Sequence, residues 1–439
     1  MKFYNRENEL AILQRANLLK SKQGVMSVVI GARRVGKTAL VLHTFTKEPL
    51  LYFFVSRKNE ALLCEEFVQE IQSKLHVDIF GKIEKFEELF AYLLKLSQER
   101  AFTLVIDEFQ NFYKVNESIF STIQKLWDKS RLKVKMHFIA CGSIYSLMKQ
   151  IYEDSKEPLF GRADFKIDLK PFKVSTIKAI LNDYNCYNPQ NLLDFYTITG
   201  GVAKYIELFV LYESFSLNKM IKEIFNPYSL FLEEGKNRLI EEFGKDYTNY
   251  FSILSLIASS KTSRKEMESI LEKNISGYLH RLESDYNIIK SIKPIDAKLN
   301  SKVQKYEIVD NFLSFWFRFV YKYSSLVEAE AFDKLKEIVL RDFSTYKGKY
   351  LKKLFIELLK EQGKFTNIGN YWERGNKNEI DIVAVDEIEK KLLICEVKLS
   401  KKRLSQEQLI QKSVNLVKKY KGYEIEYKLL CVEDIDRVF

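Results

Sequence analysis

The segment VVIGARRVGKTALVLHTF, residues 28–45, combines two glycines with a lysine and a hydroxyl at a fixed spacing. Gly31 and Gly36 let the backbone wrap around phosphate groups without a Cβ in the way, and the loop N–H groups then face the β-phosphate. Lys37 can reach the β- and γ-phosphates, and the Thr38 hydroxyl can bind Mg²⁺. An apolar strand before the loop and a helical pattern after it predict a nucleotide-binding P-loop.

Two acidic residues end the next strongly apolar strand, TLVIDEFQ, residues 103–110. Asp107 can hold Mg²⁺ through water, and Glu108 can polarise the water that attacks the γ-phosphate. Solvated acids at a strand end are common in isolation. Downstream of a P-loop, they predict the metal-binding and catalytic carboxylates of an ATPase.

Two further residues are candidates with open alternatives. Ser143 ends the strand-like run FIACGS, where its hydroxyl could sense the γ-phosphate, although a turn serine is an equal interpretation. Arg162 follows a glycine in PLFGRADF and could act in trans as an arginine finger, which would require a homo-oligomer. A structural or surface arginine explains the same residue.

The hairpin NEIDIVAVDEIEKKLLICEVKLS, residues 378–400, places charges in apolar strands, where an unpaired charge is costly. Glu396 and Lys398 project together because residues two apart in a strand share a face, and Asp381 lies on the neighbouring strand. With Glu357 on the helix upstream, the three carboxylates could hold Mg²⁺ for phosphodiester cleavage while the lysine stabilises the transition state. A structural Asp381–Lys398 salt bridge is the alternative.

The elements that must position these residues form an α/β multidomain protein. Alternation of short strands with helical patterns predicts a P-loop parallel sheet, and three helical segments before a strand-like end predict a winged helix. In the winged helix, His280 and Arg281 are the candidate DNA contacts, and protein packing is the alternative use. The expected domains are a P-loop ATPase core (1–170), a helical lid (171–240), the winged helix (241–310), a connecting helix (311–340) and an α/β domain (341–439).

Composition narrows the class of protein. The chain has 439 residues, 46% of them hydrophobic, and a net charge of +11. The positive charge indicates an acidic partner such as nucleic acid. A basic surface that is merely solvated explains the charge equally well. Five scattered cysteines without a CxxC pair argue against a zinc site or a disulfide framework. The same cysteine pattern fits a reducing cytoplasm, and we expect no membrane segment because the longest aromatic run, FLSFWFRFVY, is too short to span a bilayer.

Six motifs, FYNRENEL, GARRVGKT, LVIDEFQ, CGSIYSLM, EPLFGR and TGGVAKYIELF, occur in an order that resembles prokaryotic "archaeal ATPase" proteins. These are STAND-like P-loop ATPases related to the AAA+ proteins, and the resemblance covers about residues 1–240. It implies that Asn5 and Arg6 lie near the nucleotide base. Ala203 departs from the family pattern, which usually has proline there.

The C-terminal region resembles the PD-(D/E)XK restriction-endonuclease-like core, with Asp381, Glu396 and Lys398 in the motif positions. The preceding YEIVDNFLSFWFRFVYKY resembles the junction in ATPases that carry such a domain. The combined resemblance implies an ATP- and Mg²⁺-dependent ATPase that couples nucleotide state to DNA binding or DNA cleavage. The alternatives are a nucleotide-switched regulator or scaffold whose nuclease-like domain binds without cutting, and a remodelling ATPase with a protein partner.

Overall fold

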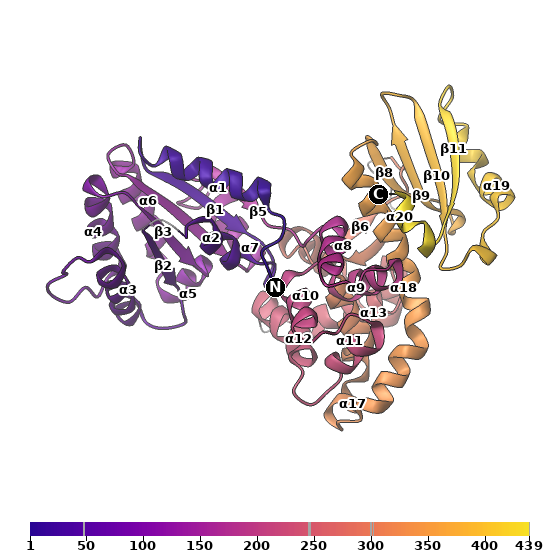
Figure 1. The fold of residues 1–439 in the computed structure, drawn as a ribbon, viewed down its shortest axis with the longest axis horizontal. Helices are drawn as coiled ribbons and strands as arrows, with labels where there is room; N and C mark the ends of the chain where they lie inside the picture. Colours follow the sequence, from indigo (N-terminus) through magenta and orange to yellow (C-terminus); the bar gives the residue numbers. More distant parts are fainter. Residues whose placement is uncertain (47–48, 245–246, 299–300, 302, 439) are drawn as a thin grey trace. The chain divides into compact units, whose positions relative to one another are not determined.

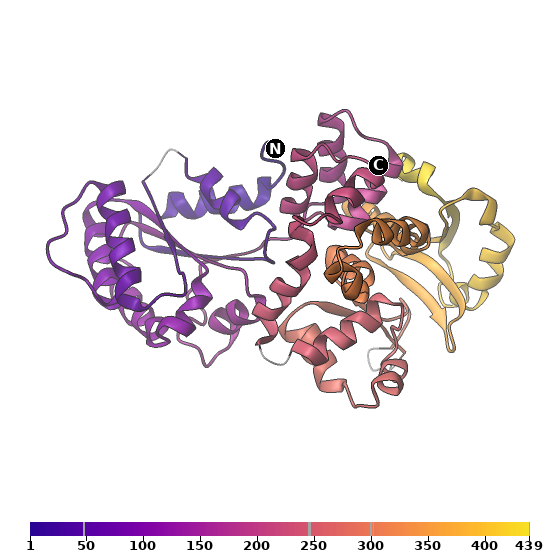
Figure 2. The same ribbon diagram turned by 90° about the horizontal axis from the view of Figure 1, so that it is seen from below.

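The computed structural model describes residues 1–439 except 47–48, 245–246, 299–300, 302 and 439. The chain divides into two compact units, one of residues 5–170 and one of residues 1–4 together with 171–439. Each unit is described by itself (Figures 1 and 2). We call them the N-terminal unit and the C-terminal unit.

The N-terminal unit contains a five-stranded sheet in the order β2-β3-β4-β1-β5, with every neighbouring pair parallel. All residues of β1, β3 and β4 are buried, as expected for central parallel strands that helices cover on both faces. The α/β prediction is confirmed, although the short strand β5 was not predicted. The strands are β1 (Val25–Ile30), β2 (Leu50–Phe54), β3 (Phe102–Asp107), β4 (Met136–Gly142) and β5 (Phe165–Asp168).

Helices occupy the segments that join the strands, because parallel neighbours need a crossover connection. Packed rings hold them to the sheet, and Phe53 stacks on Phe67 with ring centroids 4.2 Å apart. Because parallel strands all end at one edge, the segments after β1, β3 and β4 meet there. The helices are α1 (Glu7–Leu19), α2 (Lys37–Thr44), α3 (Glu60–Leu75), α4 (Phe86–Glu99), α5 (Phe112–Val115), α6 (Ser118–Ser130) and α7 (Tyr145–Glu153).

The C-terminal unit begins with helices and a small antiparallel hairpin. The order of three helices followed by the β6–β7 pair is the order expected at 241–310. Helices α8 (Val174–Asp183), α9 (Pro189–Thr199), α10 (Ala203–Leu211), α11 (Leu217–Ile224) and α12 (Leu230–Phe243) come first. They are followed by α13 (Tyr247–Ala258), α14 (Arg264–Leu271), α15 (Ser276–His280), β6 (Ile289–Ile292), β7 (Lys305–Ile308), α16 (Asn311–Phe319) and α17 (Ser324–Glu328).

The longest helix of the unit, α18 (Phe332–Gln362), has 31 residues. The predicted boundary between residues 340 and 341 falls inside it, so the connecting helix and the first helix of the last domain are one element. Near its end, the Glu361 carboxylate accepts hydrogen bonds from the N–H groups of Val174 (2.9 Å) and Ser175 (3.4 Å). Since the first N–H groups of a helix have no partner within it, α18 caps α8.

The last sheet has the order β11-β10-β9-β8. Strands β8, β9 and β10 pair antiparallel, whereas β10 and β11 are parallel and joined through a helix. One core runs from α8 through α18 to one face of this sheet, and a second core lies between the other face and α19. The elements are β8 (Asn367–Glu373), β9 (Lys377–Asp386), β10 (Lys391–Val397), α19 (Gln406–Val417), β11 (Glu424–Leu430) and α20 (Ile435–Val438).

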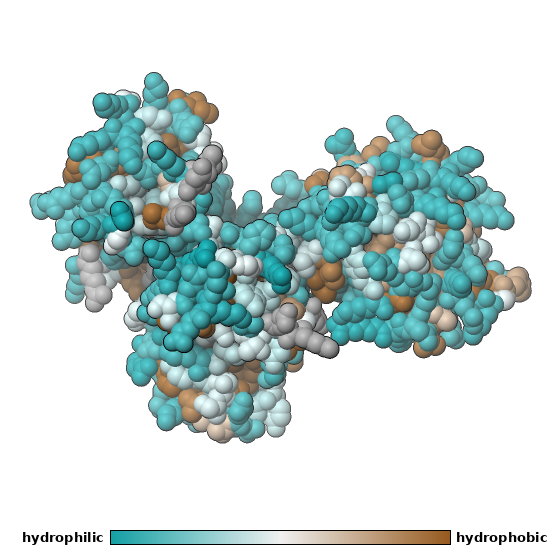
Figure 3. Space-filling view, turned by 180° about the vertical axis from the view of Figure 1, so that it is seen from behind, coloured by the Kyte–Doolittle hydropathy of each residue, from teal (hydrophilic) through white to brown (hydrophobic). Residues whose placement is uncertain are grey.

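In the described part of the chain, no helix is long and apolar enough to cross a membrane. Hydrophilic side chains cover most of the face in Figure 3, and hydrophobic ones are scattered among them. Isolated apolar side chains of this kind are normal on protein surfaces.

Candidate nucleotide site and carboxylate–lysine cluster

The loop between β1 and α2 has the backbone that its glycines permit. Gly36, the residue before α2, has φ 100°, and a Cβ on Gly31 would lie 2.7 Å from the carbonyl oxygen of Leu169. The Lys37 ammonium donates to the carbonyl oxygens of Gly31 (2.8 Å) and Ala32 (3.1 Å). The cation therefore lies along the loop that is expected to surround the phosphates.

Thr38 and Asp107 meet at the carboxyl edge of the sheet. The Thr38 hydroxyl donates to Asp107 Oδ2 at 3.1 Å, and the Tyr52 hydroxyl donates to the same oxygen. Burial and the Asp107 carboxylate raise the pKa of Tyr52, which keeps the phenol protonated as a donor. A hydroxyl beside a carboxylate suits Mg²⁺, which prefers hard oxygen ligands and retains several waters. The residues therefore fit the predicted cation.

Glu108 lies directly after β3 with a left-handed backbone, φ 52°. Its Oε2 accepts a hydrogen bond from Ser143 Oγ at 2.7 Å, and the Gln110 amide donates to the same atom. The structure thus brings two predicted residues, Glu108 and Ser143, into direct contact. Sequence reasoning missed Tyr52 and Gln110; the polar residue Gln110, close behind the two acids, was an available signal, whereas Tyr52 lies on another strand and gave none.

The segment before α1 lies against the P-loop. Arg6 has φ 83°, and its Nη2 donates to the carbonyl oxygen of Val35 at 3.3 Å, while Nη1 pairs with Glu9 at 3.4 Å. Burial lowers the pKa of the Arg6 guanidinium. The Asn5 side chain accepts from the Arg6 N–H at 2.6 Å. Base recognition by Asn5 and Arg6 stays a prediction, and the contact with Val35 places Arg6 beside the loop.

Arg162 lies in the segment between α7 and β5. Its Nη2 is 3.2 Å from Asp128 Oδ2 on α6, and its Nη1 donates to the carbonyl oxygen of Phe160 at 2.8 Å. These contacts fix the guanidinium within its own unit. A role in trans stays a prediction.

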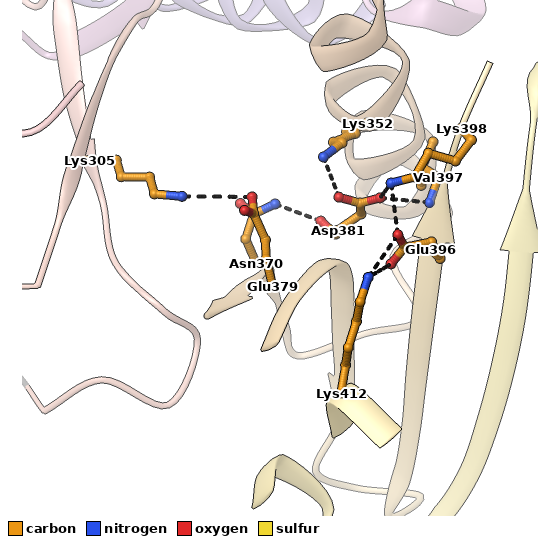
Figure 4. Close-up of polar contacts among 9 residues, drawn as sticks. All are labelled: Lys305, Lys352, Asn370, Glu379, Asp381, Glu396, Val397, Lys398 and Lys412. Atoms are coloured by element: carbon orange, nitrogen blue, oxygen red, sulfur yellow. Dashed lines mark hydrogen bonds and ion pairs between the residues drawn. The ribbon is translucent and has the colours of Figure 1, made fainter. Parts of the chain in front are cut away.

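In the C-terminal unit, Asp381 on β9 and Glu396 on β10 lie side by side, and three lysines approach them from different directions (Figure 4). Asp381 Oδ2 accepts from the N–H of Val397 at 2.8 Å and lies 3.4 Å from Lys398 Nζ. Asp381 Oδ1 pairs with Lys352 of α18. The antiparallel register that pairs Ile382 with Cys395 places the two acids opposite each other.

Glu396 is held by two lysines. Its Oε1 lies 2.7 Å from Lys398 Nζ, and Lys412 of α19 contacts Oε1 at 3.1 Å and Oε2 at 3.2 Å. Burial alone would lower the pKa of Lys398, but Glu396 and Asp381 raise it, so the ammonium stays charged. Asp381, Glu396 and Lys398 are therefore brought together as predicted, and Lys352 and Lys412 join them.

Glu357 does not join this cluster. Its carboxylate pairs with Lys360 at 3.0 Å, and Lys352, five residues earlier on α18, reaches Asp381 instead. Five residues turn a helix by about 140°, so the two side chains leave α18 on different faces. Among the described residues, no group of three or more His, Cys, Asp or Glu is placed to hold a metal ion. The predicted three-carboxylate magnesium site is therefore not assembled.

The predicted DNA-reading residues lie at the end of α15 and just after it. His280 ends that helix, and Arg281 begins a single π-helical turn, where its Nη1 donates to the Tyr250 hydroxyl at 3.5 Å. Contact of either residue with DNA stays a prediction.

Comparison with known proteins supports the N-terminal assignment. Residues 3–209 match a family model described as an ATPase domain predominantly from Archaea, and residues 316–411 match one described as archaeal and bacterial proteins of unknown function. The Walker-type ATPase of Pyrococcus abyssi shares the fold, with a TM-score of 0.55 at 20% identity over 72% of this chain and 96% of that one. Residues 3–209 are therefore similar to an archaeal ATPase domain, and the chain shares the fold of a Walker-type ATPase.

A full-length relative extends the similarity beyond this domain. An uncharacterized protein of Methanocaldococcus jannaschii is 29% identical over 406 residues, which cover 90% of this chain and 87% of the relative. Similarity to this archaeal sequence therefore extends well beyond residues 3–209.

Proposed function

We propose that the chain binds and hydrolyses ATP at the P-loop and uses its nucleotide state to control nucleic-acid binding by the C-terminal unit. The observation that carries the first half is the convergence of Lys37, Thr38, Asp107 and Glu108 at one edge of the sheet, with Ser143 on the catalytic carboxylate. These are the parts that phosphoryl transfer requires.

Each residue has a defined task in this reaction. Lys37 offsets the charge of the β- and γ-phosphates, and the Thr38–Asp107 pair supplies the oxygen ligands for Mg²⁺, which neutralises charge that develops during transfer. Glu108 orients the attacking water and accepts its proton. Ser143 and Gln110 fix the Glu108 carboxylate, so a change in either contact would alter the position of the base.

The C-terminal domain adopts a restriction-endonuclease-like arrangement in this proposal. The element order α18-β8-β9-β10-α19-β11, with Asp381 and Glu396 on adjacent strands, supports it. The lysine pairing of both acids favours a domain that binds nucleic acid without cutting it. The β6–β7 hairpin with α13–α15 would be the winged helix that assists binding.

The ATPase half is tested with two substitutions that separate binding from chemistry. Lys37→Ala should abolish ATP binding because the phosphates lose their cation. Glu108→Gln should bind ATP normally but lower kcat by about 100-fold or more, since general-base catalysis contributes on this scale. Fluorescent-nucleotide binding and phosphate release measure the two effects. Wild-type turnover in both variants would reject the assignment.

The nuclease question is tested on the same preparations. Supercoiled, linear and single-stranded DNA, and RNA, are incubated with the full chain, Mg²⁺ and ATP. We expect binding in mobility shifts and intact nucleic acid on denaturing gels. Cleavage that disappears with Asp381→Ala would instead establish an active nuclease.

A further inference from the structure

The carboxylate–lysine cluster, defined as Asp381, Glu396, Lys352, Lys398 and Lys412, has an uneven distribution of charge. The two carboxylate side chains are only 3% and 8% exposed, whereas the three lysine side chains are 30–35% exposed. Two negative and three positive groups leave an excess of one positive charge. The cluster therefore combines two buried acids with three partly exposed lysine side chains.

The carboxylate oxygens are already engaged by these cations. Lys352 pairs with Asp381 Oδ1, while Oδ2 accepts from the Val397 N–H and contacts Lys398. Lys398 and Lys412 hold Glu396. A divalent cation in such a site would bind the same oxygens. Paired buried charges resist removal of one partner, so the lysines compete directly with a metal ion.

The lysines retain capacity for another anion. An ammonium group has three N–H donors, and the contacts above use one donor of Lys352 and two each of Lys398 and Lys412. The lysines come from α18, the end of β10 and α19, so three elements direct positive charge to one place (Figure 4). Phosphate oxygens are suitable acceptors for such charge-assisted hydrogen bonds.

We propose that Lys352 takes the place of a divalent cation in this cluster, and that Lys352, Lys398 and Lys412 bind the phosphate backbone of nucleic acid without a metal ion. This inference rests on the proposed nucleic-acid role of the C-terminal unit and specifies its site. It departs from the magnesium-dependent chemistry that the sequence motif implies.

The test measures binding of a fluorescein-labelled DNA duplex to the full chain by fluorescence anisotropy. Binding in EDTA should equal binding in Mg²⁺ at matched ionic strength within about twofold. Lys352→Met and Lys412→Ala should each weaken binding by about 3- to 10-fold and lower the salt slope by about 1, because each loses one phosphate contact.

Lys336→Met is the matched control. Lys336 lies on the same helix as Lys352, pairs with Asp333, and has a side chain 28% exposed. Its distance along the helix from Lys352 is about 24 Å. Like the two test variants, Lys336→Met removes one positive charge, so its DNA affinity shows the effect of net charge alone. Thermal unfolding of every variant establishes that it is folded, and Lys412→Ala tests the site without removing the Lys352 partner of Asp381.

Three results would overturn the inference. The first is DNA binding that requires Mg²⁺, and the second is wild-type affinity in both folded lysine variants. The third comes from electron paramagnetic resonance of Mn²⁺ added without nucleotide: loss of one bound Mn²⁺ in Asp381→Asn would show that the native cluster is a metal site. We expect the Asp381→Asn titration to match the wild type.

The same data separate this inference from the proposed function. If the wild type binds DNA but the lysine variants bind equally well, the site is wrong while the nucleic-acid role stands. If the wild type binds no DNA in either buffer, the nucleic-acid role fails as well. ATP hydrolysis by each variant, which should be unchanged, tests the ATPase half independently.

Discussion

Single residues around the nucleotide site carry information that the P-loop motif lacks. Tyr52 was not predicted from the sequence because a tyrosine in PLLYFFV is equally suited to a packed strand. The structure shows its hydroxyl on the Asp107 oxygen that also accepts from Thr38. Tyr52 therefore acts as a positioning residue for the carboxylate expected to hold Mg²⁺.

Tyr52→Phe should raise the Mg²⁺ concentration for half-maximal ATP hydrolysis by about 3- to 10-fold, because Asp107 loses a charge-assisted hydrogen bond. The kcat at saturating Mg²⁺ should stay within about twofold of the wild type. Tyr92→Phe, on the partly buried surface of α4, is the control. An unchanged or lowered Mg²⁺ requirement would contradict the positioning role.

A second residue, His137, makes stability depend on pH. It is fully buried on β4 with Nε2 2.8 Å from Ser27 Oγ, and burial, with a smaller effect of Lys20, lowers its pKa to about 3. The unfolded histidine, with a pKa near 6.5, binds more protons between pH 3 and 6.5, so stability falls as the pH drops through this range. Above this pH range His137 is neutral in both the folded and the unfolded state, so it no longer contributes to the pH dependence of stability.

At pH 5 this protonation should lower the free energy of unfolding by about 2 kcal/mol relative to pH 7. His137→Gln should remove that part of the pH dependence and can retain a hydrogen bond with Ser27. Urea unfolding at both pH values measures this loss of stability. It is carried out on the wild type, on His137→Gln and on His43→Gln, a control at an exposed histidine. Equal losses in all three proteins would exclude the buried histidine as the cause.

At the scale of elements, the sequence predicts most of the N-terminal unit. The alternation of apolar runs with amphipathic segments identifies four of the five strands, β1 to β4, and the residues at their carboxyl ends meet because parallel strands share an edge. The short strand β5 was not predicted because FKID contains too few apolar residues to indicate a strand. Glu357 was misassigned because the helix face toward Asp381 depends on how α18 packs, which residue type alone does not determine.

The same packing explains why the boundary at 340 was wrong. Leu335, Val339 and Phe343 of α18 all lie in the core shared with the earlier helices. A helix whose buried face continues across the proposed boundary cannot be divided there without exposing that face. Charge and turn signals in the sequence do not reveal this continuity.

A fragment of residues 341–439 should therefore fail to fold cooperatively, whereas a fragment of residues 171–439 should fold. The shorter fragment cuts α18 and loses the helices that cover one face of the last sheet. Circular dichroism during urea titration and resistance to limited proteolysis distinguish the two. A sharp, cooperative transition in residues 341–439 would show that the last sheet and the rest of α18 are sufficient.

For the whole molecule, the proposed function assigns one activity to each of the two compact units. The N-terminal unit contains Lys37, Thr38, Asp107 and Glu108, and the C-terminal unit contains the carboxylate–lysine cluster. In the C-terminal unit, helices α8–α12, α18 and one face of the last sheet share a core. Helices packed in one core are expected to move together. If nucleotide binding shifts the position of these helices, the last sheet would therefore shift with them.

The central claim is that nucleotide state controls nucleic-acid binding, and DNA affinity measured in fixed nucleotide states tests it most directly. Anisotropy titrations compare Glu108→Gln held with ATP, wild type with ADP, and Lys37→Ala with either nucleotide, all with Mg²⁺. We expect DNA affinity to differ at least about fivefold between the ATP and ADP states, a coupling of about 1 kcal/mol, and to show no response to nucleotide in Lys37→Ala. The same DNA affinity in every state, with nucleotide binding verified for Glu108→Gln and wild type, would contradict it.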